Sequence, residues 1–251
     1  MSRWVVALAA LNGPVLALAQ TAADQSTTTL SEVVVTAHRM NYNGANELSL
    51  DKLTQPLVDT PQSISVVPKH VMEAQGVTTL RDVLRNVAGI SLAAGEGGSQ
   101  GDNLTIRGFS ARNDIFLDGM RDFGSYYRDP FDLEEVDVLK GPSSVTFGRG
   151  STGGVINQET RSPKGHPFIA GSVDLGSDLT RRATADFNRP WGRSAAFRLN
   201  VMGQDSGVAG RDIAESRRAG IAPSLAFGLG TPTRFTLSYF HQSADDTPDY
   251  G

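Results

Sequence analysis

Apolar and polar side chains alternate over long stretches in the last third of the chain. Val173 and Leu175 alternate with polar neighbours, and the same pattern recurs over residues 197–201 and 235–239. A strand with two such different faces needs a cover for its apolar face, which is protein core in a soluble sheet and lipid in a transmembrane barrel. The pattern therefore predicts antiparallel sheet from residue 168 onward, of one of these two kinds.

The first twenty residues indicate the cellular compartment. A short basic start that includes Arg3 precedes a mostly apolar stretch over residues 4–18, and residues 17–19 (ALA) give the small-x-small pattern that precedes signal cleavage. About 15 apolar positions fall short of the roughly 20 that a membrane-spanning helix needs. We expect a signal peptide over residues 1–19, cut after Ala19, and a mature chain that is periplasmic or lies in the outer membrane.

The composition excludes several classes of protein. With 23 basic and 27 acidic residues the formal net charge is −4, which argues against binding to nucleic acid. Cysteine is absent and the four histidines are scattered, so we expect no thiolate site, no zinc or haem ligand set and no bound metal. No serine lies in a nucleophile elbow, and we therefore expect no catalytic residues and no enzyme.

A β-branched run stands alone in a polar N-terminal arm over residues 20–51. It comprises Glu32, Val33, Val34, Val35, Thr36 and Ala37. The run could be the first strand of the following domain, or an unpaired strand that a partner protein binds by β-augmentation. The second interpretation gains support from residues 41–46, which are again polar and typical of turns.

Residues 52–165 carry the pattern of one compact α+β domain. An alternating strand over residues 64–67 lies between Pro61 and Pro68, and an apolar stripe predicts a helix that begins after Thr79 and ends before Gly89. Further strands are expected over residues 103–109, 114–118, 136–140 and 155–160. Residues 166–251 then hold roughly five strands, too few to close a bacterial barrel, which needs at least about eight.

Several motifs stand in a fixed order along the first two thirds of the chain. They are residues 32–37 (EVVVTA), 59–67 (DTPQSISVV), 106–109 (IRGF), 116–122 (FLDGMRD), 136–144 (VDVLKGPSS) and 147–157 (FGRGSTGGVIN). Their order and spacing resemble the N-terminal part of TonB-dependent outer-membrane siderophore receptors. The run over residues 115–157 is most similar to the catecholate-siderophore branch.

The resemblance implies the fold class and the partners. It implies an α+β plug domain followed by the first strands of an antiparallel transmembrane β-barrel, which has 22 strands in the full-length family and is incomplete here. Residues 32–37 would be the TonB box, in a flexible periplasmic tether. The implied partners are TonB with its ExbB–ExbD motor, a ferric siderophore, outer-membrane lipid and the barrel-assembly machinery, with the receptor a monomer.

The resemblance also places the ligand contacts in the plug's apical loops, around residues 93–102, 110–113 and 121–131. The third loop holds an aromatic and cationic mixture suited to an anionic, ring-bearing ferric complex. The candidate ligand-binding residues are Arg121, Phe123, Tyr126, Tyr127, Arg128 and Phe131. The alternative is that these aromatic side chains pack the plug against the barrel wall.

The function implied is binding of a ferric siderophore, of catecholate type, and its TonB-energised import across the outer membrane. The siderophore is transported cargo, and no covalently bound cofactor is expected. Two alternatives stay open: a receptor of the same machinery for haem, cobalamin or a glycan, and a soluble periplasmic binding module.

Overall fold

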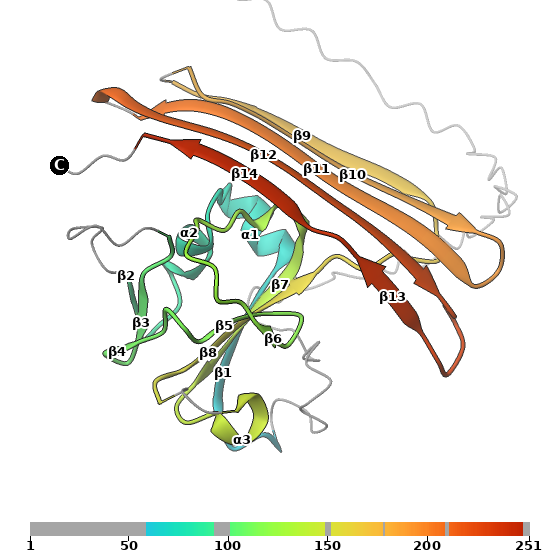
Figure 1. Cartoon of the computed structure of the whole chain (residues 1–251), viewed down its shortest axis with the longest axis horizontal. Coiled ribbons are helices and arrows are strands. Elements are labelled where there is room, and N and C mark those ends of the chain that lie inside the picture. The colour runs from blue at the N-terminus through green and yellow to red at the C-terminus, as the bar shows by residue number, and fades with distance from the viewer. Residues whose placement is uncertain (1–58, 93–100, 149–151, 178, 209–210, 248–251) are drawn as a thin grey trace, which may run out of the picture. The chain divides into compact units, whose positions relative to one another are not determined.

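The computed structural model describes residues 59–92, 101–148, 152–177, 179–208 and 211–247 (Figure 1). All of them belong to one compact unit, Asn41–Gly251. The predicted signal peptide, the tether and the predicted TonB box over residues 32–37 lie outside the described residues. Within the described part, no helix is long and apolar enough to cross a bilayer.

A mixed sheet forms the centre of the N-terminal domain. Its strands, in spatial order, are β1 (Ser63–Pro68), β7 (Leu133–Lys140), β8 (Gly154–Thr160), β5 (Ile115–Leu117) and β6 (Met120–Arg121). β5 pairs with β8 in parallel, and the other pairs are antiparallel. The strands predicted over residues 64–67, 114–118, 136–140 and 155–160 are confirmed.

Two short helices, α1 (Lys69–Gln75) and α2 (Leu80–Leu84), pack on one face of this sheet. The predicted cap of α2 is confirmed, because the Thr79 hydroxyl accepts a hydrogen bond from the Asp82 amide at 3.2 Å. α2 is shorter than predicted, since it ends at Leu84. α1 was not predicted because its buried apolar residues, Val71 and Met72, are adjacent and give no helical spacing.

A small second sheet and two further turns of helix complete the domain. The sheet consists of β2 (Ile90–Leu92), β3 (Leu104–Ile106) and β4 (Phe109–Ser110), and the turns are the 3₁₀ helix η2 (Pro130–Asp132) and α3 (Ser144–Phe147). Arg107 was expected inside a strand, which is wrong. It lies between β3 and β4 with φ 52°, where the chain must turn sharply.

The C-terminal part forms one long antiparallel sheet. Its strands are β9 (Phe168–Leu175), β10 (Arg181–Trp191), β11 (Ala195–Val208), β12 (Arg211–Phe227), β13 (Phe235–Ser238) and β14 (His241–Asp246). β13 and β14 both pair with β12, over residues 224–227 and 216–221 respectively, so they form one interrupted strand. The predicted number of roughly five strands is confirmed by the order β13-β12-β11-β10-β9.

The two faces of this long sheet differ as the alternation predicts. On one face Ile169, Val173 and Trp191 are 75–79 % exposed. On the other face Asp186 and Arg198 are buried against the N-terminal domain. Figure 1 shows α1 beneath the face formed by β10, β11 and β12. The polar face therefore turns toward the domain and the apolar face away from it.

Candidate ligand-binding site

The predicted ligand-binding residues all lie on the segment that joins β6 to β7 through η2. They are not equally accessible. Phe123 is 77 % exposed, Arg121 is partly exposed, and Tyr126 and Tyr127 are half-buried. Arg128 is only 3 % exposed. The structure therefore separates a surface group from a buried group within one short segment.

Arg121 and Phe123 form the exposed end of the segment. The Arg121 guanidinium carbon lies 5.3 Å from the centroid of the Phe116 ring and 5.9 Å from that of Phe123. The carboxylate of Asp114 is 3.8 Å from the guanidinium. The Arg121 guanidinium, 22 % exposed, thus lies between the buried Phe116 ring and the exposed Phe123 ring, and its accessible part is suited to contact with anions and with other rings.

Tyr126 and Tyr127 are engaged with neighbouring side chains. The Tyr126 hydroxyl donates to Asp122 Oδ2 at 2.8 Å. Burial raises the pKa of Tyr126 and the nearby Asp122 charge adds to it, against the opposing charge of Arg128, so the phenol stays protonated. The Tyr127 ring lies 5.8 Å from the Arg218 guanidinium of β12. Both rings thus help to hold the segment in place.

Phe131 packs the domain against the long sheet. Its side chain is 5 % exposed and forms an apolar cluster with Met202 and Ala222, and its ring centroid is 6.0 Å from that of Phe240. For this residue the structure agrees with the alternative drawn from the sequence, in which an aromatic side chain packs on the wall.

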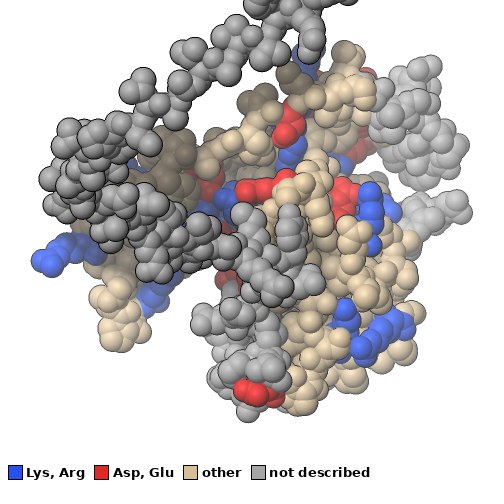
Figure 2. All heavy atoms as spheres, turned by 180° about the vertical axis from the view of Figure 1, so that it is seen from behind, with Lys and Arg blue, Asp and Glu red and all other residues tan. Residues whose placement is uncertain are grey.

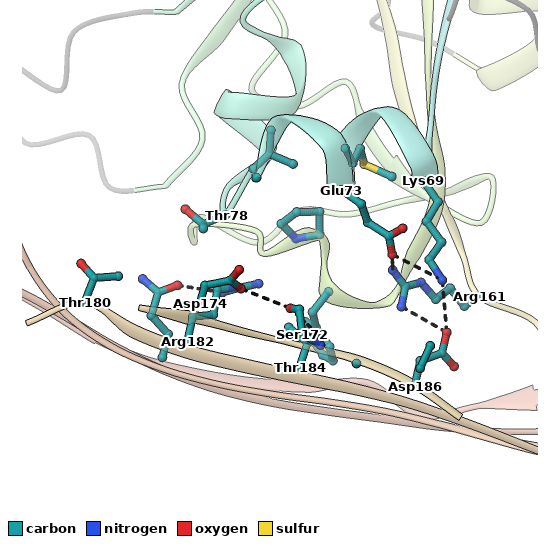
Figure 3. A pocket seen from close by; sticks show the side chains of 18 of the residues that line it. Lys69, Glu73, Thr78, Arg161, Ser172, Asp174, Thr180, Arg182, Thr184 and Asp186 are labelled. Carbon is teal, nitrogen blue, oxygen red and sulfur yellow. Dashed lines mark hydrogen bonds and ion pairs between the residues drawn. The ribbon is translucent and has the colours of Figure 1, made fainter. Parts of the chain in front are cut away.

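A cavity of about 700 Å³ lies between the domain and the long sheet. Figure 3 shows Lys69 and Glu73 of α1 on one side of it and residues of β9 and β10 on the other. Its lining is mostly small or polar. The apolar part of the lining comes from Met72, Val77, Pro130 and Phe131.

Asp186 of β10 gathers positive charge at one end of this cavity. Its carboxylate accepts two hydrogen bonds from Arg198, at 2.8 Å and 2.7 Å, and one from Arg161 at 3.3 Å. Lys69 Nζ is 3.4 Å away. Figure 3 shows Arg161 and Lys69 reaching Asp186 from the side of the domain. The domain and the sheet thus share one buried ionic network.

Glu134 extends the network on the domain side. Burial raises the pKa of Glu134, but the hydrogen bond from Lys164 at 2.9 Å and the charges of Lys164 and Arg198 outweigh it, and the pKa lies below its usual value. The carboxyl group is therefore ionised at neutral pH and helps to compensate the buried cations.

A second ionic contact lies at the other end of the cavity. Here the long sheet supplies the cation and the domain supplies the anion. Asp129, in the segment before η2, accepts hydrogen bonds of 2.7 Å from both Nη atoms of Arg182 on β10. Arg182 also donates to Gln204 of β11 at 2.7 Å. In Figure 2 blue and red spheres lie side by side on the visible described surface, in keeping with such paired charges.

Sequence reasoning missed these ionic residues. Arg182, Asp186 and Arg198 occupy the polar positions of alternating strands. The face of the sheet on which their side chains lie was therefore predictable, but the residues that they bind were not. No group of metal-binding side chains was found among the described residues.

The comparisons with known proteins agree with the motifs. A family model described as the TonB-dependent Receptor Plug Domain matches residues 56–155. The probable TonB-dependent siderophore receptor PiuA of Acinetobacter baumannii is 46 % identical over 80 % of this chain and 27 % of its own length. The catecholate siderophore receptor Fiu of Escherichia coli K12 is 40 % identical over 92 % of this chain and 31 % of its own length.

Solved structures show the same fold. The closed form of Fiu from Escherichia coli K12 has a TM-score of 0.79 and 41 % identity, over 83 % of this chain and 30 % of that one. The structure of PiuA from Acinetobacter baumannii has a TM-score of 0.80 and 44 % identity, over 83 % and 30 % of the two chains. The chain spans about a third of the length of the curated relatives it matches, 27 % for PiuA and 31 % for Fiu.

Proposed function

Because this chain belongs to the family of TonB-dependent receptors, with a plug domain followed by barrel strands, we propose that it binds a ferric siderophore of catecholate type for import across the outer membrane. The observation that carries the ligand class is the contact on the plug between the partly exposed Arg121 and the exposed Phe123 ring. The names of the relatives PiuA and Fiu point to the same class of ligand.

The chemistry of the ligand fits this surface. A ferric tris-catecholate complex is anionic and presents flat aromatic rings. Arg121 offers positive charge and Phe123 offers a ring face, and both contacts grow stronger where water is excluded. Tyr126 covers Arg128 beside this pair, whereas Tyr127 and Phe131 contact the long sheet.

Energy for import comes, in this proposal, from TonB. The segment over residues 32–37 serves as the TonB box, whose backbone adds a strand to TonB, and the ExbB–ExbD motor drives the pull. A pull on an N-terminal strand reaches the plug through β1. Outer-membrane lipid covers the exposed apolar face of the barrel strands, and the receptor is a monomer inserted by the barrel-assembly machinery.

The test is chelate binding by the receptor, extracted from outer membranes as its gene produces it. Quenching of intrinsic fluorescence by a ferric catecholate should saturate, and Arg121→Ala should weaken the affinity about tenfold. Arg85→Ala, at a side chain 65 % exposed on α2, is the control. A response to haem, cobalamin or a glycan but not to ferric catecholate would favour the alternative nutrient receptor. Recovery only in the soluble periplasm would contradict a membrane receptor.

A further inference from the structure

The segment between β6 and η2 folds around the guanidinium of Arg128. Arg128 Nε and Nη2 lie 2.9 Å and 2.8 Å from Asp122 Oδ2. Nη2 also donates to the carbonyl oxygen of Gly124 at 2.8 Å, and Nη1 to that of Tyr126 at 3.3 Å. The Tyr126 ring covers the guanidinium, with 4.3 Å between Cζ and the ring centroid. A single buried side chain thus fixes the backbone and side chains of its own loop.

The same side chain joins this loop to a second one. Arg128 Nη1 donates to Asp102 Oδ2 at 3.2 Å, and the Arg128 amide donates to the same oxygen at 3.1 Å. The Asp102 amide donates to the carbonyl of Tyr126 at 3.2 Å. At Gly101 a Cβ atom would lie 2.6 Å from the Tyr126 nitrogen. The two segments are therefore in backbone contact around Arg128, with no room for a side chain at residue 101.

Asp122 connects the buried Arg128 to the residues at the surface. It stands between Arg121 and Phe123 in the sequence, and its carboxylate points inward, to Arg128 and to the amide of Gly124 at 2.9 Å. Because Asp122 is held from below, the Phe123 side chain that follows it is turned outward, whereas Arg121 lies between the Phe116 and Phe123 rings. Phe123 is 77 % exposed, and its ring centroid lies 5.9 Å from the Arg121 guanidinium carbon.

We propose that Arg128 is a positioning residue for the chelate: it makes no contact with the ligand, but fixes residues 122–126 so that Arg121 and Phe123 form a preformed surface. This inference rests on the proposed function, since it takes the chelate to meet those two side chains. A preformed surface loses less conformational entropy when the ligand binds. The planar guanidinium is required, because an ammonium group cannot donate to so many acceptors in one plane.

The first experiment compares Arg128→Lys with wild type in uptake of a ferric catecholate by the intact receptor. The KM should rise about tenfold and the melting temperature should fall, because aligned charge-assisted hydrogen bonds are lost, while Vmax measured well below the melting temperature stays unchanged. Arg85→Lys, at a side chain 65 % exposed on α2, is the matched control and should leave all three values unchanged. An unchanged KM, or a lower Vmax together with a lower melting temperature, would overturn the positioning role.

The second experiment needs no chelate. The 251 residues contain no cysteine, so Ser125→Cys gives the one site for a spin label within them, on the exposed part of the loop, and any cysteine elsewhere in the receptor is replaced by serine first. Adding Arg128→Lys should increase the mobile component of the spectrum, and adding Arg85→Lys should not. An identical spectrum with and without Arg128→Lys rejects the inference. If the receptor takes up no ferric siderophore at all, the proposed function fails, whereas the label still reports whether Arg128 holds the loop.

Discussion

Arg182 and Asp186 lie four residues apart on the inward face of β10 and bind opposite charges of the plug. Arg182 holds Asp129, with 2.7 Å between Nη2 and Oδ1, and Asp186 holds Arg161, with 3.3 Å between Oδ2 and Nη1. Both carboxylates and the Arg182 side chain are buried. These two contacts therefore fix the position of the plug along β10. If the plug shifted by four residues along the strand, a plug charge would meet a like charge on β10.

Asp186→Asn should destabilise the receptor, because Arg161 and Arg198 would keep buried charges without their shared carboxylate. A loss of about 3 to 5 kcal/mol is expected when one partner of a buried ion pair is removed. Thermal unfolding of the purified receptor measures it. Asp174→Asn, on the exposed strand β9, is the control. Removing Arg161 as well, as Arg161→Gln, should restore part of the loss, and strictly additive effects of the two changes would contradict the shared network.

Gly154→Ala should destabilise the plug more than Gly76→Ala. Both glycines have positive φ, 144° and 60°, but an added Cβ at Gly154 meets the carbonyl oxygen of Leu139, whereas nothing lies within 4 Å at Gly76. Gly76→Ala should cost about 1 to 2 kcal/mol for the backbone conformation alone, and Gly154→Ala more, since β7 and β8 must separate. The order of the two melting temperatures decides the prediction; equal values would contradict it.

Asp137→Asn should reduce the pH dependence of stability between pH 4 and pH 7. Burial, with the charge of Glu135 added, raises the pKa of Asp137 to about 7, and the amide of Asn157 opposes this only in part. The folded state then holds a proton that the unfolded state has lost above pH 4, so stability falls as the pH rises through this range. Unfolding by urea at several pH values measures the slope. A slope unchanged from wild type would show that Asp137 does not titrate there.

Val34→Pro should abolish contact with TonB while leaving chelate binding intact. Proline removes a backbone donor and cannot take part in the middle of a paired strand. Site-specific crosslinking to TonB and fluorescence quenching by the chelate measure the two properties separately. Thr27→Pro, in the polar part of the tether, is the control. Unaltered crosslinking of the Val34→Pro variant would reject residues 32–37 as the TonB box.

The site was predictable in part, and the reason differs between residues. The aromatic rings and guanidinium groups over residues 121–131 predicted a ligand-binding segment, because the residue types alone show which contacts a segment can make. It could not show that Arg128 points inward while Phe123 points outward. That difference depends on acceptors supplied by Asp102, which is distant in the sequence.

By itself the sequence determined four strands of the central sheet, the start of α2 and the two faces of the long strands. Strand alternation, the Thr79 cap and the motif order depend on near neighbours, and these act through local backbone geometry and the burial of apolar surface. Only the tertiary structure decided which charges meet. Lys69 of α1, Arg161 after β8 and Arg198 of β11 converge on Asp186, because this carboxylate is only 3 % exposed between the plug and the barrel wall, and a buried carboxylate must be compensated by the cations that the packing brings near.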